Sequence, residues 1–241
     1  MLVEVSAASV QLTVHPRVVI DVRRLIPCLL AAGAVLAPVT ASAQKPPKPP
    51  GQQGVTLRTS AAQVTFSQTL TAKVSVKGAK AGVGVTLQRR PSTSQVWSDV
   101  ATKPTDGKGD ASFTTRPRVN VYYRALARTT PEQTSAESLV KVAPRVSFRV
   151  SDSTPRAGQR VRFSGTVRPR HNGRRVSVQR KVNGGSFVTV RRATLRAATS
   201  TYSRYSLRVR VRRTATYRVR ILGHADHAIG ISRERVLTTH A

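Results

Sequence analysis

Hydrophobic and polar residues alternate along much of the chain. The clearest stretch runs from residue 205 to residue 222 and reads YSLRVRVRRTATYRVRIL. Successive side chains of a β-strand point to opposite faces, so a period of two predicts strands that are buried on one side and solvated on the other. The solvent-facing arginines of this stretch are then Arg208, Arg210, Arg212, Arg218 and Arg220.

The alternation recurs because the chain contains two copies of one unit. Sliding the sequence against itself by 91 positions superposes several segments, and the match continues beyond a small insertion. The matched pairs are QTLTAKVSV (68–76) with QRVRFSGTV (159–167), VTLQRR (85–90) with VSVQRK (176–181), Trp97 with Phe187, and Tyr123 with Tyr217. A register held over so many segments indicates a tandem duplication. We place the two units at residues 54–143 and 144–241.

Each unit should contain seven short strands. In the second unit the alternating runs fall near residues 146–151, 159–167, 175–182, 186–193, 203–211, 215–222 and 230–237. Turn segments such as HNG at 171–173 and NGG at 183–185 separate them, and their residues tolerate the positive φ of tight hairpins. Short strands at this spacing, without helical periodicity, are typical of a two-sheet sandwich. The sequence therefore predicts an all-β protein with two tandem seven-stranded β-sandwiches.

The second unit also carries the motifs of a known family. Its segments FSGTV, NGRRVSVQRKVNGGSFVTV, YSLRVRV and TATYRVRI resemble those of tandem bacterial immunoglobulin-like domains in secreted actinobacterial proteins. The first unit departs from this pattern, with Val74 at the position of Gly165 and Ala111 at the position of Tyr205. The resemblance covers roughly residues 54–238. It implies an immunoglobulin-like fold and an extracellular setting, and it implies no catalytic residues.

Four aromatic residues are expected to support these folds. Within an immunoglobulin-like sandwich, Tyr123 and Tyr217 would lie early on the sixth strand, where a tyrosine hydroxyl often bonds back to the main chain. We expect Trp97 and Phe187 to cap the two cores by packing. The alternative for Trp97 is an exposed platform on which a sugar ring stacks.

The first 53 residues have the features of export and spacer segments. Paired arginines at 23–24, an apolar run and the sequence ASA before Gln44 predict a secretory signal peptide over residues 1–43, and a true start codon within about the first 20 residues is a hypothesis. The apolar run is short and contains prolines, so we expect no transmembrane segment in the mature chain. Residues 44–53, QKPPKPPGQQ, predict a stiff proline-rich linker. The single cysteine, Cys28, would leave with the signal peptide, so no disulfide is expected.

The charge of the chain is strongly positive and unevenly distributed. Lys and Arg number 41 against 10 Asp and Glu, a formal net charge of +31. Residues 54–143 hold 13 basic and 5 acidic side chains, a net of +8, whereas residues 144–241 hold 23 and 3, a net of +20. Such an excess favours contact with polyanions. We predict a polyanion-binding surface formed by Arg208, Arg210, Arg212, Arg218 and Arg220.

Two alternatives to binding stay open as the cause of the arginine excess. The chain has 32 Arg against 9 Lys, a ratio that a GC-rich genome produces without selection for binding. A solvated arginine face is also tolerated at ordinary ionic strength, because salt screens repulsion between exposed charges.

Residue patterns that carry catalysis or bind metals are sparse. The loop at 224–227, HADH, offers two histidines and one carboxylate, fewer than the three or four rigid ligands that zinc requires, so we expect a solvated loop. Residues 106–110, DGKGD, resemble a calcium loop in composition but lack the spacing of an EF-hand. We find no nucleophile motif and no evident carboxylate pair. The sequence predicts no catalytic residue, no cofactor, no metal and no enzymatic activity.

These patterns predict an exported, non-catalytic protein that is secreted or associated with the cell envelope. We expect it to act as a binding or spacer module whose partner is an anionic cell-wall polymer or another polyanion, with no specific nucleic acid. Two other classes stay open: a purely structural secreted protein without a dedicated ligand, and a carbohydrate-binding accessory protein. The oligomeric state stays open as well.

Overall fold

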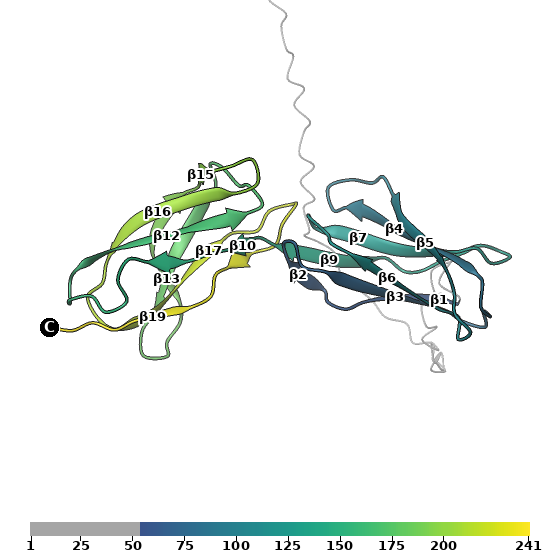
Figure 1. The fold of residues 1–241 in the computed structure, drawn as a ribbon, viewed down its shortest axis with the longest axis horizontal. Helices are drawn as coiled ribbons and strands as arrows, with labels where there is room; N and C mark the ends of the chain where they lie inside the picture. The colour runs from purple at the N-terminus through teal and green to yellow at the C-terminus, as the bar shows by residue number, and fades with distance from the viewer. Residues whose placement is uncertain (1–53) are drawn as a thin grey trace, which may run out of the picture. The chain divides into compact units, whose positions relative to one another are not determined.

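The computed structural model describes residues 54–241, and the strands of this part of the chain form β-sandwiches (Figure 1). The predicted all-β class is confirmed. The predictions for the signal peptide, the linker and Cys28 concern residues 1–53 and lie outside the described residues. Residues 54–241 contain no helix that is long and apolar enough to cross a membrane.

The first repeat, residues 54–143, is built from two sheets. Its strands are β1 (Val55–Thr59), β2 (Gln63–Thr65), β3 (Leu70–Val76), β4 (Gly84–Pro91), β5 (Ser98–Pro104), β6 (Asp110–Thr115), β7 (Val121–Ala127), β8 (Gln133–Thr134) and β9 (Ser138–Ala143). One sheet has the order β1-β3-β6 and the other the order β2-β9-β7-β4-β5, with β8 also paired to β7. Strands β2 and β9 run parallel, whereas the other pairs are antiparallel.

The second repeat, residues 144–241, has the corresponding arrangement. Its strands are β10 (Arg145–Val146), β11 (Arg149–Val150), β12 (Arg160–Arg168), β13 (Arg175–Lys181), β14 (Val188–Thr194), β15 (Arg196–Ala197), β16 (Ser203–Arg210), β17 (Ala215–Ile221), β18 (Gly230–Ile231) and β19 (Arg235–Leu237). One sheet has the order β10-β12-β16-β15 with β11 on β12, and the other the order β14-β13-β17-β18 with β19 on β17. In the first repeat β1, β3 and β6 share one sheet, and β4, β5 and β7 lie in the other. The corresponding strands of the second repeat are β10 with β11, β12 and β16 in one sheet, and β13, β14 and β17 in the other. This is the strand order of an immunoglobulin-like sandwich, and the predicted fold is confirmed.

The predicted strand at 146–151 is divided into β10 and β11 because side-chain groups replace a backbone bond. Both pieces pair with β12 in the same register. Between them, the Tyr205 hydroxyl donates to the Ser147 carbonyl over 2.7 Å. The Thr166 N–H therefore bonds to the Ser147 hydroxyl at 2.8 Å rather than to that carbonyl. The ladder is interrupted, but its polar groups are satisfied.

The predicted strand at 230–237 is divided by a bulge that occurs in both repeats. Ser232 lies between β18 and β19, and its hydroxyl accepts the Val219 N–H at 2.9 Å. In the first repeat the Ser135 hydroxyl accepts the Ala125 N–H at 2.9 Å, between β8 and β9. A serine beside the shift in register supplies the acceptor that the displaced backbone cannot.

Each sandwich encloses its own apolar core. The buried residues of the first core lie between Val55 and Val142, and those of the second between Val146 and Leu237. In the second core the Phe163 ring packs at a centroid distance of 5.2 Å against both Phe148 and Tyr217. Burial of such apolar side chains contributes about 1.5–3 kcal/mol each to folding.

The structure differs from the expectation for the four aromatic residues. Tyr123 and Tyr217 are buried in the cores, but neither hydroxyl bonds to the main chain: that of Tyr123 contacts the Thr115 hydroxyl at 3.4 Å, and that of Tyr217 has no partner among residues 54–241. Trp97 and Phe187 are only half-buried and lie outside both cores. They stack on arginines instead, because an aromatic face attracts a guanidinium and leaves one ring edge in water.

Candidate polyanion-binding surface

Arginines cover the outer face of the sheet formed by β10, β12, β16 and β15. On β12 and β16 the apolar residues alternate inward, so the intervening residues face solvent. The strand register then sets arginines directly opposite one another: Arg160 with Arg210, Arg162 with Arg208, and Arg145 with Arg168. Like charges in such cross-strand positions destabilise a sheet unless a counter-charge is present.

The centre of this face is a depression of about 1160 Å³. Nine of its lining residues are arginines: Arg145, Arg149, Arg162, Arg168, Arg191, Arg192, Arg196, Arg204 and Arg208. We call this set the arginine depression. Its other lining residues are neutral, and no aspartate or glutamate lines it. The depression is therefore positively charged throughout.

Part of the depression comes from the edge of the opposite sheet. Strand β14 supplies Arg191 and Arg192, and the Arg191 guanidinium donates to the Arg208 carbonyl at 3.0 Å. The chain then crosses to the first sheet, where Arg196 of β15 lies opposite Arg204 of β16. This crossing closes one side of the depression.

The charges of the arginine depression are not neutralised within residues 54–241. The ion pairs of this part of the chain involve other cations, namely Arg90, Lys181, Arg218 and His224. Within the depression, Arg162 donates to the neutral Ser206 hydroxyl at 3.1 Å, and Arg168 stacks on Tyr202 at 4.8 Å. These contacts orient guanidinium groups but leave their charge uncompensated, as a site for anions requires.

The five arginines predicted from the sequence do not form one group. Arg208 lines the depression, Arg210 lies on the same strand, and Arg212 follows the end of β16. Arg218 and Arg220 belong to β17, which is in the other sheet. The two halves of the stretch at 205–222 therefore serve different sheets of the sandwich.

Arg218 has internal partners that occupy its guanidinium. Its Nε donates to the Gln179 side chain at 2.9 Å, its Cζ lies 3.7 Å from the Phe187 ring centroid, and Glu234 is 3.9 Å away. In the first repeat Arg124 donates to Gln88 at 2.8 Å and lies 4.3 Å from the Trp97 centroid. Both repeats share this Gln–Arg–aromatic stack, which joins neighbouring side chains on the outer face of the sheet.

Eight arginines of the depression were not identified from the sequence: Arg145, Arg149, Arg162, Arg168, Arg191, Arg192, Arg196 and Arg204. The alternation that marks β16 is also visible in RVRFSGTVR of β12. What the pattern lacks is the strand order, which brings residues from 145 to 208 together on one face.

The equivalent face of the first repeat has a different charge. A depression of about 400 Å³ there is lined by Arg58 and Lys73 together with Asp106 and Asp110. The backbone N–H groups of Asp110 and Lys108 donate to Asp106 and lower the pKa of its carboxyl group. This carboxylate stays ionised at neutral pH, so the depression of the first repeat carries charges of both signs.

The loop at 224–227 does not match the expectation of a solvated loop. His227 is 6% exposed, and His171, from a loop between β12 and β13, is 7% exposed and lies beside it. No sequence pattern indicated this neighbour, since 53 residues separate His171 from His224.

Comparison with known proteins gives no family. No family model and no curated protein matches the chain. Among solved structures, the chain is similar to bovine butyrophilin, with 12% identity over 74% of this chain and 94% of that one and a TM-score of 0.39. It is also similar to a variant of Salmonella alpha-2-macroglobulin, with 12% identity over 78% of this chain and 16% of that one and a TM-score of 0.33.

Proposed function

We propose that this protein is an exported, non-catalytic immunoglobulin-like module whose second repeat binds an anionic polymer of the cell envelope in the arginine depression. The observation that carries the proposal is the lining of the depression, with nine arginines and no acidic side chain. The immunoglobulin-like sandwich is suited to this role, because it presents a rigid face on which side chains vary without disturbing the core.

The energetic argument begins with repulsion between the arginines. Arg162 and Arg208 are cross-strand neighbours, and Arg160 and Arg210 are the next such pair. Their repulsion destabilises the free sheet, and a bound polyanion would relieve it. Binding therefore gains both the direct attraction and the release of this repulsion.

The chemistry of the ligand follows from the geometry of arginine. A guanidinium holds phosphate or carboxylate through two parallel hydrogen bonds, which a lysine ammonium cannot reproduce. Alternate residues of a strand are about 6.6–6.8 Å apart and neighbouring strands about 4.8 Å apart. A linear polymer with closely repeated phosphates or carboxylates fits such a grid of charges.

The test is binding of heparin and of teichoic acid to three forms of the purified protein. Replacing Arg162, Arg204 and Arg208 with Ser removes three charges from the depression. The matched control replaces Arg175, Arg213 and Arg233, which are exposed and lie outside it, and so has the same net charge. We expect the first variant to lose at least tenfold in affinity and the control to lose much less. The affinity of the unmodified protein should fall steeply with salt, as counterion release requires.

Equal losses in the two variants would mean that net charge alone drives association, and affinity that is indifferent to salt would contradict the proposal. Circular dichroism of each variant shows whether the fold is retained. Release of the protein from isolated cell walls by a high-salt wash tests the envelope as the location.

A further inference from the structure

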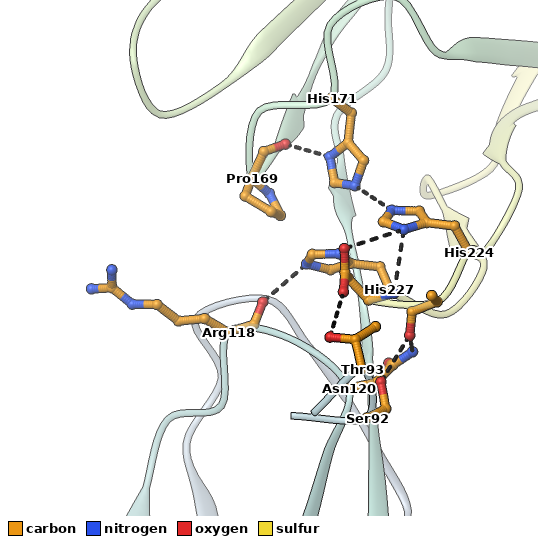
Figure 2. Close-up of polar contacts among 10 residues, drawn as sticks. Ser92, Thr93, Arg118, Asn120, Pro169, His171, His224 and His227 are labelled. Carbon is orange, nitrogen blue, oxygen red and sulfur yellow. Dashed lines mark hydrogen bonds and ion pairs between the residues drawn. The ribbon is translucent and has the colours of Figure 1, made fainter. Parts of the chain in front are cut away.

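Three histidines from two loops meet at one end of the second repeat (Figure 2). His171 lies between β12 and β13, and His224 and His227 lie between β17 and β18. Their ring centroids form a nearly equilateral triangle with sides of 5.2, 4.9 and 5.2 Å. One ring nitrogen from each residue lies within 4.8 Å of the other two.

Two of these rings are fixed by a backbone carbonyl. The Nδ1 of His171 donates to the Pro169 carbonyl at 2.7 Å, and the Nε2 of His227 donates to the Arg118 carbonyl at 2.9 Å (Figure 2). A ring nitrogen that donates a hydrogen bond leaves the other nitrogen with a free lone pair. The free lone pairs are then on Nε2 of His171 and Nδ1 of His227.

The Nδ1 atom of His227 is buried and has no hydrogen-bond partner within residues 54–241. Leaving a buried acceptor unpaired is unfavourable, and such atoms commonly mark an ion or another ligand. The Nε2 atoms of His171 and His224 lie 3.1 Å apart. This separation is close to that of two nitrogens bound at about 2.0–2.1 Å to one tetrahedral ion.

The three imidazoles are shielded from solvent to different degrees, with His171 and His227 buried and His224 partly buried. Burial lowers the pKa of His227 to about 4, and it also lowers the pKa of His171 and of His224. The charge of the nearby Arg174 lowers the pKa of the last two further.

We propose that His171, His224 and His227 form a binding site for a divalent first-row transition metal, with Zn²⁺ as the expected ion. Three imidazole nitrogens suit Zn²⁺, Cu²⁺ and Ni²⁺ and are poor ligands for Ca²⁺ or Mg²⁺. A zinc site with three histidines keeps its fourth position for water or another ligand.

Asp226 supports this assignment from the second layer of the site. Its carboxylate lies 3.9 Å from Nδ1 of His224 and accepts a hydrogen bond from the Thr93 hydroxyl at 3.4 Å. With a metal on Nε2, the Nδ1 of His224 would carry the ring proton, and the Asp226 carboxylate, 3.9 Å away, would have to move closer to accept a hydrogen bond from it. Carboxylate–histidine–metal arrangements orient the ring and raise its affinity for the metal.

The competing interpretation is a hydrogen-bonded cluster without a metal. In that case Nε2 of His224 donates to Nε2 of His171, and Nδ1 of His224 accepts the Asp226 N–H at 3.3 Å. This network satisfies two rings but still leaves Nδ1 of His227 unpaired within residues 54–241. The two interpretations differ in whether the protein takes up zinc.

The experiment is calorimetric titration of the EDTA-treated protein with ZnCl₂, together with the visible spectrum after addition of CoCl₂. We expect one Zn²⁺ per chain, a higher melting temperature with zinc, and the strong visible absorption of low-coordinate Co²⁺. His224→Gln should weaken zinc binding at least tenfold, and Asp226→Asn by about tenfold. The matched control is His240→Gln, a histidine outside the cluster, which should bind zinc like the unmodified protein.

Zinc uptake that is equal in His224→Gln and in the unmodified protein would overturn the proposal, and so would the absence of uptake by the unmodified protein. His224 is the least buried of the three, so its variant is the most suitable if those at His171 or His227 fail to fold. Heparin affinity should be unchanged in His224→Gln, because His224 does not line the arginine depression. The metal site and the proposed function can therefore fail separately.

Discussion

The two repeats share a strand order but differ in charge on the same face, which is mixed in the first repeat and positive in the second. On the sheet formed by β1, β3 and β6, the first repeat carries two bases and two acids. The second repeat carries nine arginines in a depression nearly three times as large, about 1160 against 400 Å³. Solvent-facing positions of a sheet can change in this way because the buried alternate positions alone hold the fold. The outer face is therefore where the copies have diverged in charge.

The repeats also differ at one cross-strand pair on the inner faces of their sheets, and here a change in one residue is compensated by a change in the other. In the first repeat Val74 lies opposite Ala111, and in the second Gly165 lies opposite Tyr205. A Cβ added to Gly165 would lie 2.1 Å from the Ser147 carbonyl oxygen and 2.6 Å from the Tyr205 hydroxyl. The glycine makes room for the tyrosine. The two positions at which the repeats differ here are thus one exchange of volume across a strand pair.

The largest effect is expected from giving the second repeat the valine of the first. Gly165→Val places atoms where the Ser147 carbonyl and the Tyr205 hydroxyl already lie, and we expect a loss of about 3 kcal/mol or more in the free energy of unfolding. Adding Tyr205→Ala recreates the Val–Ala pair and should recover part of this loss. The coupling between the two changes is read from a double-mutant cycle by chemical denaturation.

The single tryptophan provides the control for this experiment. Trp97 is in the first repeat, so its fluorescence reports on that sandwich, whereas circular dichroism reports on both. Gly165→Val should lower the denaturant concentration at which the second repeat unfolds. The midpoint of the fluorescence change, which reports on the first repeat, should stay nearly the same. If Gly165→Val and the double variant are equally unstable, the two positions are not a compensating pair.

The sequence was sufficient for what depends on local alternation. It predicted the all-β class, the sandwich and most of the long strands, because period-two burial is visible residue by residue in stretches such as 203–211. It also identified Val74 and Ala111 as departures, but not that they face each other, since register is a property of two strands together.

The candidate sites depended on distant pairing and could not be read from the sequence. Only the strand order brings Arg145, Arg192 and Arg208 to one depression. Likewise, His171 joins His224 and His227 because two loops end at the same side of the sandwich. Trp97 was misplaced for another reason: its size suggested a core position, but Arg124 offers it a stacking partner at the surface.

The next largest effect concerns exchanged charges. Arg204 and Asp110 occupy equivalent places, because they pair with Thr166 and Ser75 at matching registers. Arg204→Asp should weaken heparin binding about tenfold, or about 1.4 kcal/mol. Asp110→Arg should strengthen the weaker binding of the first repeat. On duplex DNA as a model polymer, the salt slope should decrease in size by about 0.9 for each phosphate that the variant no longer neutralises.

Affinity titrations at several salt concentrations check this exchange. Arg233→Asp is the matched control, because it makes the same charge change at an exposed residue outside the depression. If Arg233→Asp and Arg204→Asp lower heparin affinity equally, the difference in charge between the two depressions does not govern binding.

A smaller effect is expected at the hydroxyl that distinguishes the second repeat. Tyr205→Phe removes the hydrogen bond to the Ser147 carbonyl, and we expect a loss of about 1 kcal/mol in the free energy of unfolding. Burial raises the pKa of the Tyr205 hydroxyl, so it stays protonated and keeps donating well into alkaline solution. Chemical denaturation at neutral pH gives the loss, and Tyr202→Phe, at a half-buried tyrosine without this bond, serves as control. If Tyr205→Phe leaves the free energy of unfolding unchanged, the hydrogen bond to Ser147 does not account for the division of the first strand into β10 and β11.

The smallest effects are expected where the repeats agree. Trp97 lies 4.3 Å from Arg124 and 5.2 Å from Arg90, and Phe187 lies 3.7 Å from Arg218 and 4.8 Å from Lys181. Replacing either aromatic residue with Leu keeps apolar contact but removes the cation–π attraction, which contributes about 0.5–1 kcal/mol at an exposed site. We expect Trp97→Leu to cost slightly more than Phe187→Leu, because tryptophan is the better partner for a cation. Denaturation followed by circular dichroism measures both. A destabilisation of about 3 kcal/mol or more, the usual cost of truncating a core aromatic, would instead make these residues the caps of their cores.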